Sequence, residues 1–216
     1  MPKILSNDDV ALFRERLCDL ALKAFVQGGA EAVSLRRLAT EAGCSRSTPY
    51  RYFKNKAAIL AAVRQMKFGQ LAEAMERAVE SGANSQQKLR ALAEAYFRFA
   101  QQNPDAYRLM YEFNQRDEHL YPDLVTQIER TQQVTLDAVA AAVQDGDIEG
   151  DPVNIASTLW AALHGLSSLH LADKLKLKRD FRELSEVMIR SLERAIATNP
   201  SKKSATRRLS ARELRS

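Results

Sequence analysis

Residues that break helices are scarce in this chain, which contains eight glycines and six prolines among 216 residues. So few breakers favour long helices over many short strands, and almost no segment alternates apolar and polar residues as a half-buried strand would. Hydrophobic residues make up 45% of the chain and charged residues 27%, as in ordinary globular proteins. The expected fold is therefore all-α, and the length suffices for one sizeable core or for a core with a small satellite domain.

Cysteine and histidine are also rare, with two and three copies. Cys18 and Cys44 lack the spacing of a metal site or of a disulfide framework, which fits a reducing cytoplasm. The histidines form no cluster of ligands in the sequence, so we expect no metal site. No nucleophile with a base, glycine-rich phosphate loop or carboxylate pair stands out. We therefore expect neither catalytic residues nor a cofactor.

Long hydrophobic runs are absent as well. The most apolar stretch, residues 155–172, contains two histidines and four hydroxyl side chains, so it predicts a buried helix and not a membrane span. No basic start followed by an apolar segment indicates a signal peptide. These observations predict a cytoplasmic protein without a membrane partner.

The net charge of +5 is distributed unevenly. Residues 1–56 carry ten basic and six acidic side chains, whereas residues 57–200 carry sixteen basic and twenty acidic ones. The tail, residues 201–216, has six basic side chains and one acidic side chain, and we expect it to be disordered or loosely helical. A basic head on an acidic body favours a polyanionic partner for the head. The tail either binds nucleic acid electrostatically or only solubilises the end of the chain.

Four helices are expected in the first 80 residues, each placed by the helical spacing of apolar residues and by a capping or turn residue. They cover Ser6 or Asn7 to Gly28–Gly29, Leu35 to Ala42 after the cap Ser34, Arg46 to about Phe53 after the cap Ser45, and about 55–80 after the cap Asn55. Gly43 supplies a left-handed turn between the second and third helices. Two helices joined in this way, the second rich in basic and hydroxyl groups, indicate a helix-turn-helix.

The rest of the chain also has helical patterns. Helices are expected over residues 86–102, 104–117, 122–144, 152–172 and 181–197. The clearest start is Asp151-Pro152, an N-cap followed by proline at the first helical position. The last two helices have more apolar surface than one subunit needs. We expect them to pack against their copies in a four-helix dimer interface.

The third expected helix has two distinct faces. On a wheel of 100° per residue, Pro49 and Phe53 form an inward stripe, and Ser47, Arg51 and Lys54 lie opposite. A solvated charged face is the alternative explanation of this basic run, but the glycine turn, the caps and the charge distribution favour a surface that faces DNA. The side-chain chemistry then assigns Arg46 and Arg51 to guanine edges, Ser47 to a base edge or a water, Thr48, Tyr50, Tyr52 and Lys56 to phosphates, and Arg36 and Arg37 to the flanking backbone.

Residues 34–56, SLRRLATEAGCSRSTPYRYFKNK, resemble the DNA-binding signature of the TetR family of bacterial transcriptional regulators. The slots of that signature hold Ser34, Leu38-Ala39, Ala42-Gly43-Cys44-Ser45, Tyr50-Arg51-Tyr52-Phe53 and Lys56. Two positions depart from the pattern. Cys44 replaces the usual valine, a swap between small apolar residues. Pro49 replaces the more usual leucine and removes the hydrogen bond back to the Ser45 carbonyl, which would bend the recognition helix.

The body of the chain resembles a regulatory domain named for its Trp-His-Gly residues. The similar segments are NPDAYRLMYEF at 103–113 and TLWAALHGLSSLHL at 158–171. Members of the family use such domains to dimerise and commonly to bind a small effector. The resemblance implies an effector pocket, for which the candidate residues are Tyr96, Phe99, Met110, Tyr111, Trp160 and His164. For each of these residues, ordinary packing in a helical core is the alternative explanation.

Together these observations predict an N-terminal three-helix DNA-binding domain (1–56), a connecting helix (about 55–80), and an effector-binding and dimerisation domain (57–200). The predicted function is a repressor that binds a palindromic operator in double-stranded DNA as a homodimer and is released by a small-molecule effector. One alternative is a DNA-binding regulator that takes no ligand and responds to a protein partner. Another is a helical ligand-binding or enzymatic protein whose basic surface is incidental.

Overall fold

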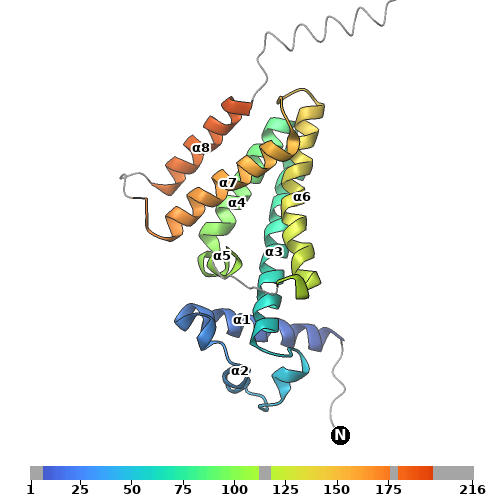
Figure 1. The fold of residues 1–216 in the computed structure, drawn as a ribbon, viewed down its shortest axis with the longest axis vertical. Coiled ribbons are helices and arrows are strands. Elements are labelled where there is room, and N and C mark those ends of the chain that lie inside the picture. Colours follow the sequence, from blue (N-terminus) through green and yellow to red (C-terminus); the bar gives the residue numbers. More distant parts are fainter. Residues whose placement is uncertain (1–6, 112–117, 176–179, 197–216) are drawn as a thin grey trace, which may run out of the picture. The chain divides into compact units, whose positions relative to one another are not determined.

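The computed structural model describes residues 7–111, 118–175 and 180–196. These residues form eight α-helices and two short 3₁₀ helices, with no strand among them, so the all-α prediction is confirmed (Figure 1). The elements are α1 (Asn7–Ala32), α2 (Leu35–Glu41), η1 (Thr48–Arg51), α3 (Lys56–Ser81), α4 (Ser85–Gln102), α5 (Pro104–Tyr111), η2 (Glu118–Leu120), α6 (Pro122–Gln144), α7 (Pro152–Leu171) and α8 (Phe181–Ile196). None of these helices is long and apolar enough to span a membrane.

The chain divides into two compact units. The first comprises residues 1–70 with 103–130, and the second comprises residues 71–102 with 131–216. Both α3 and α6 contribute residues to each unit. The division into a DNA-binding domain (1–56) and an effector-binding and dimerisation domain (57–200) stays a prediction. The basic tail and the predicted helical residues 112–117 lie outside the described residues.

The first unit has a core of aliphatic side chains from α1, α2 and α3. Leu17, Leu38, Ile59 and Val63 are fully buried in it. The helical backbone of α1 breaks at the predicted glycine pair, because Gly29 has a positive φ of 67° that other residues rarely adopt. After the break, the helix continues for one short turn. The predicted N-cap of α3, Asn55, is also confirmed, since its side-chain oxygen accepts a hydrogen bond from the Ala58 N–H at 2.9 Å.

In the second unit, α4, α7 and α8 lie side by side (Figure 1). Val139 and Ala142 of α6 are fully buried against Ala156 and Leu159 of α7. The predicted start of α7 is confirmed: Asp151 caps the helix by accepting hydrogen bonds from the N–H groups of the second and third helical residues, and proline occupies the first position. This unit therefore has a helical core of its own.

Candidate nucleic-acid interface and effector cavity

The turn after α2 is built by its glycine. Gly43 has a φ of 67°, so its backbone reverses in the left-handed region. Its N–H donates to the Thr40 carbonyl at 3.1 Å, and the Cys44 N–H donates to the Ala39 carbonyl at 3.0 Å. These two bonds satisfy the last carbonyls of α2 and direct the chain toward η1. The turn predicted at Gly43 is therefore confirmed.

The recognition element is shorter and tighter than the helix predicted from Arg46 to about Phe53. It is a 3₁₀ helix of four residues, Thr48–Arg51. An α-helix would need the N–H of residue 49 to donate to the Ser45 carbonyl, but proline has no N–H. The Ser45 carbonyl instead accepts from the Thr48 N–H at 3.0 Å, which is the i+3 bond of a 3₁₀ turn. At this proline, where a bend was expected, the backbone forms a 3₁₀ helix and not an α-helix.

The predicted inward and outward faces of this element are confirmed by burial. Pro49 and Phe53 are buried, and Phe53 belongs to the core of the first unit. Ser47, Arg51 and Lys54 are exposed. Tyr50, beside them, is 51% exposed, which is high for a large aromatic side chain. An apolar pair therefore anchors the element while its polar side chains face solvent.

Several of the predicted DNA-contacting residues already have partners in the protein. The Lys56 ammonium lies 2.9 Å from a carboxylate oxygen of Glu31. The ring of Tyr52 is half-buried and packs against Phe13 at a centroid distance of 5.2 Å. The Thr48 hydroxyl lies 2.8 Å from the hydroxyl of Ser45. These three side chains therefore help to shape the element, and their contacts with phosphate stay a prediction.

The other basic side chains of this surface differ in their partners, and Arg37 of α2 pairs with Glu41 at 2.7 Å. Arg36 on α2 and Arg46, Arg51 and Lys54 around η1 are exposed, and α2 packs against η1. Within the part of the chain that the structure describes, none of these four has an ion pair with a carboxylate. Their positive charge is thus available to an external anion.

A cavity of about 450 Å³ lies within the second unit. Its walls come from α4, α7, α8 and the end of α6. Most of its lining is aliphatic, including Leu89, Leu159, Leu163, Ile189 and Leu192. A chamber of this size and character suits a small apolar molecule.

None of the six residues predicted for an effector pocket lines this cavity. Tyr96, Phe99 and Met110 are buried in the packing of their own units, and Tyr111 packs edge-on against the ring of Phe68. Trp160 is 37% exposed and stacks on His164, with ring centroids 5.6 Å apart. The His164 ring is in turn 3.3 Å from the Ser168 hydroxyl. Contact between these six residues and an effector stays a prediction.

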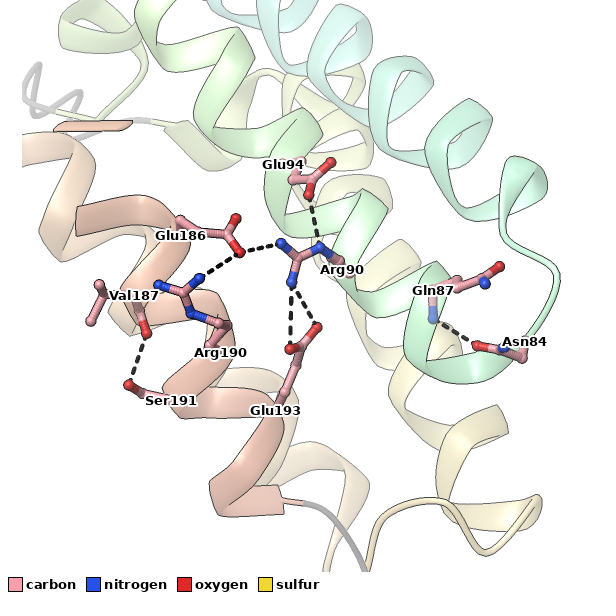
Figure 2. A network of polar contacts seen from close by, with 9 residues as sticks. All are labelled: Asn84, Gln87, Arg90, Glu94, Glu186, Val187, Arg190, Ser191 and Glu193. Atoms are coloured by element: carbon pink, nitrogen blue, oxygen red, sulfur yellow. Dashed lines mark hydrogen bonds and ion pairs between the residues drawn. The ribbon is translucent and has the colours of Figure 1, made fainter. Parts of the chain in front are cut away.

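Sequence reasoning did not single out the ion-pair network beside the cavity. Arg90 of α4 contacts Glu186 of α8 at 2.5 Å, Glu193 of α8 at 3.3 Å and Glu94 of α4 at 3.1 Å (Figure 2). Only the contact between Arg90 and Glu94, four residues apart on one helix, has a local signal in the sequence. The contacts to α8 join residues that are 96 and 103 positions apart in the chain.

The network should make the contact between α4 and α8 sensitive to acid. The hydrogen bond from Arg90 holds the pKa of Glu186 below its ordinary value. Because this pKa is lower in the folded chain than in the unfolded chain, the pair stabilises the fold at neutral pH, and that contribution is lost as the pH falls through the folded pKa. We expect Glu186→Gln to lower the melting temperature slightly at neutral pH and to make it fall less steeply toward about pH 3. Parallel melting profiles for wild type and Glu186→Gln would contradict this, and Glu73→Gln, which removes an exposed i,i+4 pair, is the matched control.

The described residues offer little other reactive chemistry. Burial raises the pKa of the Cys18 thiol to about 12, so it stays protonated and unreactive at neutral pH. Among the residues that the structure describes, histidine, cysteine and carboxylate side chains form no cluster of three that could hold a metal ion.

Comparison with known proteins links both units to one family. Residues 17–63 match the family model described as "Bacterial regulatory proteins, tetR family". Residues 89–192 match the model described as "Tetracyclin repressor-like, C-terminal domain". The two matches together cover more than half of the chain.

Individual relatives agree with this. The chain is 29% identical over 126 residues to the transcriptional activator FasR of Mycolicibacterium smegmatis, a match that covers 58% of this chain and 56% of the activator. It is 26% identical over 152 residues to the transcriptional repressor KstR of Mycobacterium tuberculosis, covering 68% of this chain and 67% of the repressor. The match thus spans little more than half the length of the activator.

A solved structure shares the fold. The transcriptional regulator FadR from Bacillus subtilis, in complex with stearoyl-CoA, superposes with a TM-score of 0.71 at 21% identity. The match covers 82% of this chain and 96% of that chain.

Proposed function

Because the chain belongs to the TetR family of bacterial transcriptional regulators, we propose that it is a cytoplasmic repressor that binds operator DNA as a homodimer and is released by a small-molecule effector. The observation that carries this proposal is the solvent-facing side of residues 46–54. There, exposed cations that pair with no carboxylate in residues 7–111, 118–175 or 180–196 lie on an element anchored by buried Pro49 and Phe53. A surface of this kind is suited to a polyanion.

The side chains of this surface divide into two roles. Arg46 and Arg51 carry planar guanidinium groups that can bridge the O6 and N7 atoms of guanine, and Ser47 can reach a base edge or a water. Phosphate oxygens are the proposed partners of Arg36, Thr48, Tyr50, Tyr52 and Lys56, which would fix the register on the duplex without reading its sequence. The existing contact between Lys56 and Glu31 does not prevent this, because a surface ion pair is weak and exchanges readily.

The proposed dimer uses the outer faces of α7 and α8. Large apolar side chains are exposed on both helices: Val153, Trp160 and Leu169 on α7, and Val187 on α8. Because these apolar side chains are exposed on α7 and α8, a second surface would cover the face that their own unit leaves open. The same two helices of a second copy would provide this covering surface, and the four helices would form a two-fold interface. A two-fold dimer reads a palindrome, with half-sites about 34–36 Å apart or a multiple of that distance.

The proposed effector site is the cavity of about 450 Å³ in the second unit. Its aliphatic walls suit an apolar molecule, and FadR, which shares the fold, was solved with stearoyl-CoA. Occupation of the cavity would favour a conformation whose recognition elements no longer match the spacing of successive major grooves. DNA and effector then oppose each other by linkage, so each lowers the affinity for the other.

Selection of bound fragments from random duplex DNA at physiological salt tests the proposal. We expect enrichment of a palindrome whose half-sites are separated by one helical turn or a multiple. Enrichment of no sequence would refute specific DNA binding. If a palindrome is enriched but no metabolite mixture changes the affinity or the melting temperature, the regulator responds to a protein partner and not to a small effector.

A further inference from the structure

The polar end of the cavity in the second unit has an unusual balance of charge. Apart from its aliphatic walls, the cavity is lined by two amides, Asn84 and Gln86, and by three charged side chains, Arg90, Asp147 and Glu193. Only one of these three charges is positive. The chemistry of the ligand therefore depends on whether that positive charge is available.

Arg90 is not available, because each of its three guanidinium nitrogens is already engaged. Its Nη2 atom contacts Glu186, its Nη1 atom contacts both carboxylate oxygens of Glu193, and its Nε atom contacts Glu94 (Figure 2). Hydrogen bonding to Glu186 raises the pKa of Arg90 above its ordinary value and lowers that of Glu186, so both groups stay ionised at neutral pH. The cation among the described residues that line the cavity is thus compensated by carboxylates of the protein.

Among the described residues, carboxylates also outnumber cations in the ion-pair network beside the cavity. A second cation of the network, Arg190, is also held by Glu186, at 3.4 Å. The cavity lining and the network together comprise two guanidinium groups, from Arg90 and Arg190, and four carboxylates, from Glu94, Asp147, Glu186 and Glu193.

This balance disfavours an anionic ligand. To reach Arg90, an incoming carboxylate would have to displace Glu186 or Glu193, and the displaced side chain would be left beside further negative charge without its partner. An incoming ammonium group would instead approach Glu193 and Asp147, the carboxylates that line the cavity, and its charge would be attracted by theirs. Aliphatic walls that end in an excess of carboxylate charge are complementary to an apolar body with a positive end.

Taking the effector function proposed above as its premise, we infer that the effector of this regulator is a lipophilic cation, an apolar molecule that ends in an amine or a quaternary ammonium group, and not a fatty acid or another amphipathic anion. The apolar part occupies the space between α4, α7 and α8. The cationic end lies at the carboxylates around Arg90.

Three probes with the same alkyl chain separate the possibilities: decylamine, decanol and decanoate. Each is titrated against the full-length protein below its aggregation concentration, and binding is followed by calorimetry and by the shift in melting temperature. We expect decylamine to bind with a dissociation constant at least about tenfold lower than that of decanoate, with decanol between them. Addition of decylamine should also weaken operator binding.

Two sets of variants place the effect at this cavity. Glu186→Gln combined with Glu193→Gln removes two carboxylates and leaves Arg90 with Glu94 as its remaining carboxylate partner, so the order of affinities should reverse in favour of decanoate. Glu73→Gln, which removes a carboxylate of the same unit away from the cavity, should keep the wild-type order. Ala93→Leu fills part of the cavity and should weaken the binding of all three probes.

The inference is overturned if wild type prefers decanoate, if the double glutamine variant keeps the wild-type order, or if none of the three probes binds. None of these results depends on DNA, so they leave the proposed operator binding to be judged by fragment selection alone. Conversely, a regulator that enriches no operator but binds decylamine as described would lose the proposed function and keep the ligand site.

Discussion

Replacing Arg51 with alanine is expected to remove most of the preference for the operator while leaving most of the general affinity for DNA. Arg51 is exposed on the solvent-facing side of η1 and has no carboxylate partner among the described residues, so its guanidinium can approach a base edge. A bidentate contact to guanine discriminates against the wrong base by roughly 1–3 kcal/mol, or about 5- to 150-fold in affinity at each half-site. Non-specific binding loses only one cation per subunit out of a basic surface, so its change should be much smaller.

Fluorescence anisotropy with the selected operator and with a scrambled duplex of equal length measures both affinities. Arg51→Lys keeps the charge but not the planar pair of donors, so it should lose specificity as Arg51→Ala does while retaining non-specific affinity. Arg98→Ala removes the same charge from an exposed position on α4 and serves as the matched control. Equal losses on operator and scrambled DNA for Arg51→Ala would exclude this residue from base readout.

The parts of the fold that the sequence predicts well are those determined by neighbouring residues. The left-handed turn at Gly43 and the caps at Asn55 and Asp151 were predictable because a turn or cap requires only a few adjacent residues of the right type. The type of the recognition helix was predicted less well. The sequence shows that Pro49 removes a hydrogen bond, but whether the chain bends or tightens into a 3₁₀ turn depends on how Pro49 and Phe53 pack in the core.

The cavity and its charges could not be predicted in the same way. The resemblance to the Trp-His-Gly domain points to aromatic, histidine and thioether side chains, yet Tyr96 and Met110 are almost completely buried, and the cavity is lined mostly by aliphatic residues. Arg90 meets Glu186 and Glu193 only because α8 packs against α4, a contact between segments far apart in the chain. Helical periodicity places these residues on their helices, but it does not show which helices become neighbours.

Replacing Gly165 with arginine is expected to separate the proposed dimer and to abolish tight operator binding without unfolding the subunit. The residues at 157, 161 and 165 lie four apart along α7, on the side that also carries the exposed Leu169, and all three are small. A Cβ atom added at Gly165 has no neighbour within 4 Å, so the single chain accommodates a side chain there. Arginine also has a better helix propensity than glycine, by roughly 0.5–1 kcal/mol. In a helix-to-helix dimer, by contrast, this position would face the second copy, where a long charged side chain prevents close packing.

Loss of the dimer converts two linked half-site contacts into separate ones, so operator affinity should fall by roughly 10²- to 10⁴-fold. Sedimentation equilibrium gives the oligomeric state, circular dichroism checks that the helices are retained, and anisotropy gives the affinity. Gln101→Arg, at an exposed position of α4, introduces the same side chain away from α7 and should remain dimeric with wild-type affinity. A dimeric Gly165→Arg protein would place the interface elsewhere. A monomeric one with unchanged operator affinity would mean that each subunit recognises its half-site independently, and the palindrome would then no longer follow from the two-fold symmetry of the protein.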